Sequence, residues 1–269
     1  MGFVIAAQTD VGTKKRTNQD SYCIREAQSE NGGILLAMIC DGMGGLEKGE
    51  LASATIVRAF AAWFETELAG VLGHKNRNEE IIRTWRRIVK EQNQRILEYG
   101  KSRHIELGST LTAVLVLEDG HYITVHVGDS RLYTFDHTGY QIITEDQTVV
   151  ANDIRLGRIT PEQALTDPRR NVLLQCIGAS RTVEPAFYEG EVGDKSFLLC
   201  SDGFRHKITG EEMLALLSPQ GCGAEAEMNL RLRRLIDTDM ERSETDNITA
   251  VLFIREKRGE QSGTNRTGY

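Results

Sequence analysis

The 269-residue sequence has few of the features that define secreted or membrane-spanning proteins. Its five cysteines are odd in number and never occur in a CxxC spacing, which argues against a disulfide framework and against a zinc site. No apolar run approaches the roughly 20 residues that span a bilayer. The N-terminus lacks the basic and long apolar regions of a signal peptide. We therefore expect a cytoplasmic protein without membrane insertion.

Basic residues are fewer than acidic residues. The chain has 32 Lys and Arg against 39 Asp and Glu, which gives a net charge of -7. A nucleic-acid binder needs a basic surface to neutralise phosphates, so we expect no nucleic-acid partner. An anionic substrate is not excluded, because a bound cation can reverse the local field. Hydrophobic residues make up 40% of the chain, which is enough for a sizeable core.

Apolar runs bounded by turn signals predict a mainly antiparallel sheet structure. Residues 33–40 are continuously apolar, as in a strand that is buried on both faces. Residues 109–128 and 131–144 each predict a hairpin, because turn residues separate two strand-forming runs. Further strands are expected over residues 195–200 and 247–254.

Helices are expected between and after these strands. Apolar residues at helical spacing predict helices over 49–70 and 78–100, the second with Asn78 as its N-cap. Capping boxes predict shorter helices after Thr160 and Thr209. A last helix is expected over about 223–237.

One domain accounts for nearly the whole chain. We find no repeat and no Pro- or Gly-rich linker up to residue 254. The expected fold class is therefore α+β, with helices layered on antiparallel sheets over residues 1–255. The polar, glycine-containing residues 256–269 are expected to form a disordered tail.

Aspartates stand where apolar runs begin or end. A single aspartate in such a place is usually a turn former or a helix cap. If antiparallel strands bring these ends together, however, several carboxylates share one small volume, and such a cluster needs cations. An all-oxygen set without Cys or His suits Mg²⁺ or Mn²⁺, and two such ions can drive hydrolysis at phosphorus. The residues are Asp20, Asp41, Asp129, Asp202 and Asp246.

Two neighbouring residues could complete such a site. Gly42 directly follows Asp41 and would expose a backbone carbonyl to a metal ion. Arg16 lies four residues before Asp20, and its guanidinium suits bidentate binding of a phosphate. Arg16 could equally be a solvated surface residue in the run KKR, and its spacing alone leaves both interpretations open.

Six short motifs occur together and in a fixed order. They are RTNQD (16–20), DGMGG (41–45), GST (108–110), GDSR (128–131), SDG (201–203) and DNIT (246–249). This set resembles the metal-dependent Ser/Thr protein phosphatases of type 2C, the PPM family, in their compact bacterial form. The resemblance covers about residues 3–254. It implies a phosphatase domain over 1–255 with a four-layer αββα sandwich of two antiparallel β-sheets flanked by helix pairs.

The resemblance also implies a ligand set for two catalytic Mn²⁺ or Mg²⁺ ions. Asp41 would bridge the ions, and the carbonyl of Gly42 would complete one of the two sites. Asp202 and Asp246 would bind the other ion, while Asp20 would act mainly through metal-bound water.

Two further roles follow from the resemblance. Asp129 would bind a third, weaker ion, and Arg16 would hold the substrate phosphate. The implied reaction is hydrolysis of phosphoserine and phosphothreonine in proteins by a metal-bridging hydroxide, without a phosphoenzyme. The implied partners are phosphoprotein substrates and a bacterial Ser/Thr kinase that the phosphatase opposes, and we expect a monomer.

Three positions depart from the family pattern. Met43 stands where animal members have a histidine proposed as general acid, so the leaving group must take its proton from elsewhere. Gln147 stands where histidine is usual, and Gln175 stands where arginine is common. Both flank residues 148–174, which correspond to a mobile flap beside the active site. We expect this flap to influence substrate choice.

An alternative is a catalytically weak or inactive member that binds phosphoproteins as a regulator. Loss of a metal-binding aspartate would mark such a protein, whereas Asp41, Asp202 and Asp246 are all present. The six histidines have no place in the motifs, and we interpret them as surface or core residues. His206, close after Asp202, is the first of them to consider as a proton donor.

Overall fold

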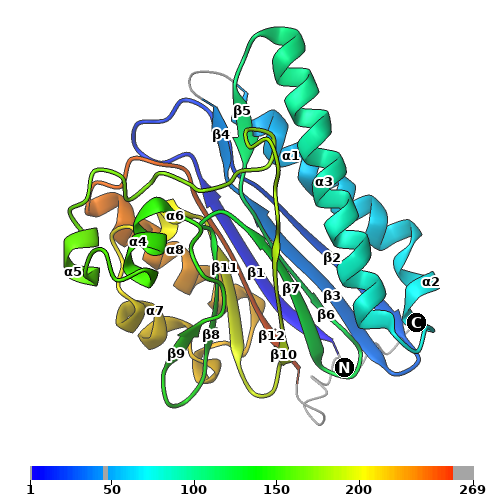
Figure 1. The fold of residues 1–269 in the computed structure, drawn as a ribbon. Coiled ribbons are helices and arrows are strands. Elements are labelled where there is room, and N and C mark those ends of the chain that lie inside the picture. Colours follow the sequence, from blue (N-terminus) through cyan, green and yellow to red (C-terminus); the bar gives the residue numbers. More distant parts are fainter. Residues whose placement is uncertain (1, 45–47, 257–269) are drawn as a thin grey trace.

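Two antiparallel five-stranded sheets form the middle of the protein in the computed structural model, which describes residues 2–44 and 48–256. A two-stranded ribbon stands beside them (Figure 1). The first sheet has the order β1 (Phe3–Asp10), β12 (Ile248–Arg255), β11 (Ser196–Cys200), β8 (Arg131–Phe135) and β9 (Tyr140–Ile142). The second has the order β10 (Ala186–Glu191), β7 (His121–Val127), β6 (Leu111–Val116), β3 (Gly32–Cys40) and β2 (Ser21–Ser29). The ribbon pairs β4 (Gly42–Gly44) with β5 (Leu107–Ser109).

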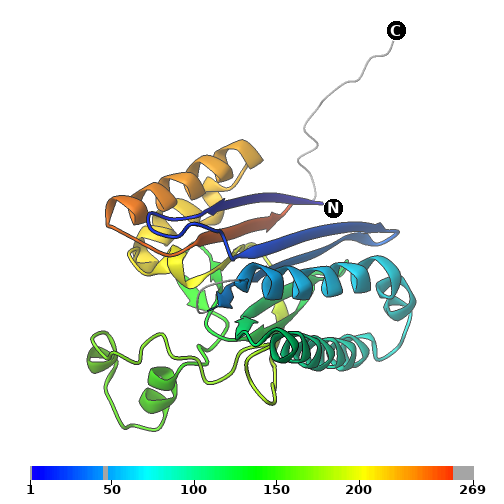
Figure 2. The same cartoon turned by 90° about the horizontal axis from the view of Figure 1, so that it is seen from above.

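Helices cover the outer face of each sheet, so the protein has four layers (Figure 2). The second sheet carries α1 (Gly49–Thr66), α2 (Leu68–Leu72) and α3 (Arg77–Arg103). The first sheet carries α6 (Asp202–Arg205), α7 (Gly210–Leu217) and α8 (Glu225–Glu241), with a 3-10 turn over Pro219–Gly221. The expected αββα sandwich of two antiparallel sheets is thereby confirmed.

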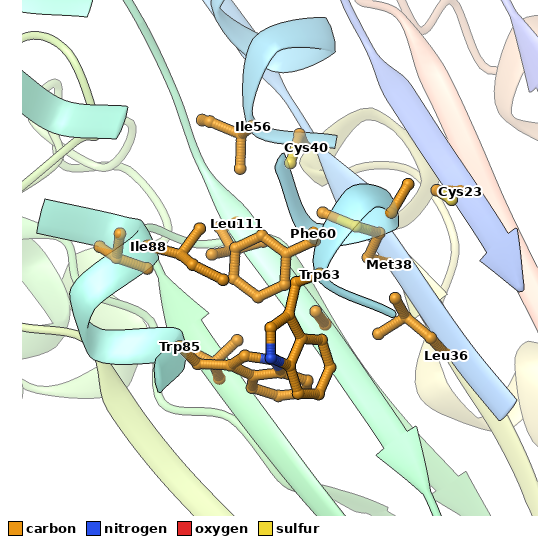
Figure 3. Close-up of a cluster of buried hydrophobic side chains, with 14 of the residues drawn as sticks. Cys23, Leu36, Met38, Cys40, Ile56, Phe60, Trp63, Trp85, Ile88 and Leu111 are labelled. Atoms are coloured by element: carbon orange, nitrogen blue, oxygen red, sulfur yellow. The ribbon is translucent and has the colours of Figure 1, made fainter. Parts of the chain in front are cut away.

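Strand β3 lies at the centre of the packing. Leu36 and Met38 point to the helix layer, where they join the cluster around α1 and α3 (Figure 3). Leu35 and Ile39 point the other way, into the cluster between the two sheets. Because side chains alternate along a strand, both faces of β3 are buried, and this explains its unbroken apolar sequence.

Aromatic rings fill the space between α1 and α3. Trp85 lies with its ring centroid 5.4 Å from those of both Phe60 and Trp63 (Figure 3). Between the sheets, Tyr122 of β7 and Phe197 of β11 meet with ring centroids 5.4 Å apart. These contacts hold the two sheets and the helix layer in a fixed relation, and so they fix the position of the strand ends.

The helix boundaries differ from the predicted ones in several places. The helix expected over 49–70 ends at Thr66, and a separate short helix, α2, follows it. The N-cap assigned to Asn78 is wrong, because α3 already begins at Arg77. The amide nitrogen of Asn78 instead donates a hydrogen bond of 3.0 Å to Glu189 on β10. The helix expected over 223–237 runs over Glu225–Glu241.

The segment 148–174 contains more structure than its sequence suggested. Besides the expected helix α5 (Pro161–Ala164), which the capping box of Thr160 opens, it contains α4 (Val149–Arg155). The hydroxyl of Thr148 caps α4 by accepting from the Ala151 N–H. Both helices lie outside the four layers (Figure 2). The second expected capping box, at Thr209, is also present.

Two expectations concern residues that the structure does not describe. The expected disordered tail over 256–269 lies, apart from Glu256, outside the described residues, and so does Gly45 of the DGMGG motif. Within the described part of the chain, no helix is both long enough and apolar enough to cross a membrane.

Candidate active site

Five aspartates from different parts of the chain meet at one end of the sandwich. Burial raises the pKa of Asp41 well above its ordinary value. The carboxylates of the other four aspartates raise this pKa further, which shows that all five share one local field. The four are Asp20, Asp202, Asp129 and Asp246.

These carboxylates are short of hydrogen-bond donors. Neither oxygen of Asp20, nor Oδ1 of Asp202, makes a hydrogen bond of good geometry in the described part of the chain, although all three atoms are buried. Burial raises the pKa of Asp20 to about 7; the hydroxyls of Thr249 and Ser201 oppose this rise, and the neighbouring Asp202 and Asp246 add to it. Burial also raises the pKa of Asp129, which is 6% exposed, to about 7. Buried carboxylates without partners are costly, so the arrangement favours a bound cation.

The GST and GDSR motifs hold the end of β3. The backbone N–H of Asp41 donates to Oγ1 of Thr110, and the N–H of Thr110 donates to the carbonyl of Asp41, both at 2.9 Å. Oγ1 of Thr110 lies 2.7 Å from Oγ of Ser130. These bonds join the ends of three neighbouring segments, and they fix the backbone of Asp41.

Two motif glycines allow backbone segments to approach closely. A Cβ on Gly42 would lie 2.4 Å from the carbonyl oxygens of both Gln19 and Gly49. A Cβ on Gly203 would lie 2.1 Å from the carbonyl oxygen of Asn247. No side chain fits at such distances, so glycine is required at both positions. The carbonyl oxygen of Gly42 is also within 3.3 Å of the Gln19 amide nitrogen, when that amide is oriented to satisfy its neighbours.

Asn247 fastens the loop that carries Arg16. Its Oδ1 accepts from the N–H of Gln19 at 2.9 Å, and its Nδ2 donates to the carbonyls of Val11 and Thr17. Arg16 is exposed and makes no hydrogen bond or ion pair with the described residues. An arginine on a fastened loop beside a carboxylate cluster remains available for an anionic ligand.

Lys15 and His206 place positive charge against two of the aspartates. Nζ of Lys15 lies 2.8 Å from Oδ1 of Asp246. Nε2 of His206 lies 3.4 Å from Oδ2 of Asp202, and its Nδ1 lies 3.3 Å from Glu244. Burial opposes protonation of His206, but Glu244 and Asp202 outweigh it and raise the pKa of this imidazole.

Sequence reasoning missed the roles of Glu244 and Asn247. Oε1 of Glu244 accepts hydrogen bonds from the backbone N–H groups of Thr245 and Asp246, so Glu244 connects His206 to the loop before β12. Its place two residues before Asp246 was the only signal available in the sequence. His206, the histidine that the sequence marked first as a candidate proton donor, contacts Asp202 and Glu244.

Met43, Gln147 and Gln175, the three departures from the family pattern, lie in the β4–β5 ribbon and at the two ends of the segment 148–174. Met43 is 36% exposed and pairs with Gly108 in the β4–β5 ribbon. Nε2 of Gln175 donates to Oε1 of Gln147 at 2.8 Å, and the same oxygen accepts from the N–H of Gly128 at 2.9 Å. The two glutamines therefore join the two ends of the segment 148–174 to the residue that precedes Asp129.

The oxygen atoms of the aspartate cluster fit two divalent ions by their chemistry, although the side chains would have to shift to bind them. The available oxygens come from carboxylates and a backbone carbonyl, as Mg²⁺ and Mn²⁺ prefer. Over residues 2–44 and 48–256, no three His, Cys, Asp or Glu side chains already form a ligand group for one ion. Lys15 occupies Oδ1 of Asp246 at 2.8 Å, and its side chain is 42% exposed. Asp129, in contrast, already has a cation beside it: Nη2 of Arg205 lies 3.0 Å from its backbone oxygen and 3.5 Å from its Oδ2.

Comparison with known proteins agrees with this geometry. A family model described as protein phosphatase 2C matches residues 10–237. A putative protein phosphatase 2C-type of Streptococcus pyogenes serotype M6 is 30% identical over 256 residues, which are 94% of this chain and 97% of the relative.

Solved structures share the fold. The serine/threonine phosphatase of S. agalactiae superposes with a TM-score of 0.79 and 28% identity, covering 94% of this chain and all of that chain (100%). The catalytic domain of the serine/threonine protein phosphatase PstP, solved with two manganese ions, gives a TM-score of 0.75 and 29% identity over 94% and 97% of the two chains. The motifs, the sandwich and these matches agree, and the chain belongs to the protein phosphatase 2C family.

Proposed function

We propose that this protein hydrolyses phosphoserine and phosphothreonine residues of other proteins with two bound Mn²⁺ or Mg²⁺ ions. One observation carries the proposal: five aspartates share one field and hold buried oxygens without well-formed hydrogen bonds in the described chain, and the exposed Arg16 directly follows Lys15, which contacts Asp246. The serine/threonine phosphatases to which the chain is similar support the substrate class.

The side chains divide the work according to their positions. Asp41, at the centre of the cluster, would face both ions, and the Gly42 carbonyl would contact one of them. Asp202 and Asp246 would hold the second ion, and Asp20 would act through water. When bound, the two ions would supply a hydroxide at neutral pH and offset the negative charge of the phosphate.

The protein's own residues would orient the substrate and the ligands. Arg16 would grip two oxygens of the phosphate through its planar guanidinium. His206 fixes Oδ2 of Asp202 and leaves the buried Oδ1 of that carboxylate available. Met43 can neither donate nor accept a proton, so the proton for the leaving alkoxide would come from water or from another residue.

The biological setting is proposed on the same basis. We infer phosphoprotein substrates in a bacterial signalling pathway and a Ser/Thr kinase that the phosphatase opposes. A cytoplasmic location accords with five cysteines that are all buried and free. We further propose that the protein acts as a monomer, and that Gln147 and Gln175 influence substrate choice by anchoring the segment 148–174.

Metal-dependent hydrolysis tests the proposed function. The purified protein should release phosphate from a phosphothreonine peptide when Mn²⁺ is present, and a chelator should stop the release reversibly. A malachite-green assay measures the product. A protein that binds the phosphopeptide but releases no phosphate with either ion would instead support the regulatory alternative.

Arg16→Ala tests the phosphate-binding role. A hydrogen bond to a charged group contributes about 1.5–3 kcal/mol, so KM for the phosphopeptide should rise roughly 10–100-fold. The affinity for Mn²⁺ should stay unchanged. Lys14→Ala, which removes a neighbouring exposed cation, is the matched control and should change KM little. Loss of Mn²⁺ affinity in Arg16→Ala would show that the arginine supports the metal ligands instead.

A further inference from the structure

Asp129 differs from the other aspartates because a guanidinium group lies against it. Arg205, the last residue of α6, places Nη2 3.0 Å from the backbone oxygen of Asp129 and 3.5 Å from its Oδ2. The same nitrogen lies 3.5 Å from Oδ2 of Asp146. One cationic nitrogen therefore has three oxygen atoms around it, as a bound metal ion would have.

The second acceptor of the Arg205 guanidinium, Asp146, is itself fixed in place. Asp146 accepts two hydrogen bonds of 2.7 Å from Nε and Nη2 of Arg131. The side chains of Arg205 and Asp146 are only 14% and 15% exposed. Lys15, the cation on Asp246, is 42% exposed and has a flexible stem. A metal ion can thus displace Lys15 far more easily than Arg205.

Positive charge already faces Asp129 at short range. Two carboxylates, of Asp129 and Asp146, face two guanidinium groups, of Arg131 and Arg205, and arginine stays protonated in proteins. A divalent ion at Asp129 would stand at contact distance from a fixed positive charge and would be repelled. Asp20, in contrast, has two buried oxygens and no ion pair with the described residues, and only the hydroxyls of Thr249 and Ser201 lower its pKa.

We propose that Arg205 is a built-in cation that takes the place of a third metal ion at Asp129. Arg205 acts as a positioning residue: it fixes Asp129, and through Asp146 it connects α6 to the start of the segment 148–174. The metal centre is then limited to two ions. This inference rests on the proposed two-ion centre. It concerns only an additional ion that would bind to the Asp129 carboxylate.

Counting bound Mn²⁺ tests the inference. Equilibrium dialysis of the full chain followed by metal analysis should give the same number of ions for the wild type and for Asp129→Asn. Arg205→Ala should gain one weakly bound ion, and the double variant Arg205→Ala/Asp129→Asn should lose it again. Lys15→Ala, which removes the exposed cation, is the matched control and should keep the wild-type count.

Two results would overturn the inference. One is a wild-type protein that binds one ion more than Asp129→Asn, and the other is a folded Arg205→Ala protein that gains no ion. Circular dichroism establishes folding, and if Arg205→Ala does not fold, the comparison of wild type with Asp129→Asn decides alone. A wild type that binds no Mn²⁺ would contradict the proposed function. A difference in the number of bound ions between a protein and its Asp129→Asn counterpart reports only on the site at Asp129.

Discussion

Asp41→Asn should reduce kcat/KM for Mn²⁺-dependent phosphopeptide hydrolysis by on the order of 10³-fold. A metal ion contributes about 4 kcal/mol to stabilising the charge of the transition state, and each ~1.4 kcal/mol corresponds to a tenfold change in rate. Asp41 is the carboxylate whose pKa responds to all four of the other aspartates, so it lies where both ions would bind. Asparagine keeps the shape of the side chain and removes its negative charge. The backbone bonds to Thr110 do not involve the carboxylate and should persist.

The measurement is steady-state hydrolysis over a range of Mn²⁺ concentrations, together with a Mn²⁺ binding isotherm. Asp237→Asn is the matched control, because it removes a carboxylate from an exposed ion pair with Arg233 on α8. That variant should retain wild-type activity within about twofold, as expected for a surface ion pair. Full activity in Asp41→Asn, with metal binding intact, would remove Asp41 from the catalytic centre.

Trp85→Ala should cost about 3–5 kcal/mol of the free energy of unfolding, the usual cost of removing a large buried ring. Trp85 is completely buried and contacts Phe60 and Trp63 at the junction of α1, α3 and the second sheet. Its Nε1 has no hydrogen-bond partner in the described chain, so the effect comes from packing. Trp85→Phe keeps an aromatic ring and should cost less.

Urea unfolding followed by circular dichroism gives the change in free energy. Leu230→Ala is the control, because Leu230 on α8 is 72% exposed and its truncation should change stability by no more than about 0.5 kcal/mol. A change below about 1 kcal/mol for Trp85→Ala would show that the α1–α3 layer contributes little to the fold. Activity measured well below the unfolding midpoint separates stability from catalysis.

The sequence predicted interior strands better than edge strands. Strands β3, β6, β7, β11 and β12 were all expected, because burial on two faces leaves long apolar runs. Of the four edge strands of the two sheets, β9 was expected as part of the hairpin over 131–144, whereas β1, β2 and β10 were not. Their residues are only partly buried, so neither a continuous apolar run nor a clean alternation marks them.

The family, the sandwich and the identity of the five aspartates followed from the sequence itself. Each aspartate belongs to a short motif at the end of a helix or strand. Such ends can be predicted from the local hydrophobic pattern and from turn-forming residues. The absence of a side chain at Gly42 is likewise visible in the sequence. The reason for it, the close approach of the Gln19 and Gly49 carbonyl oxygens, appears only in the tertiary structure.

Only the tertiary structure decided which charges neutralise which aspartates. Arg205 and Asp129 are 76 residues apart, and Lys15 meets Asp246 from the opposite end of the chain. Such contacts depend on the register of strands and on the direction of side chains across two sheets, and no local pattern encodes either. For this reason the sequence suggested a metal ion at Asp129, whereas the structure places a guanidinium there.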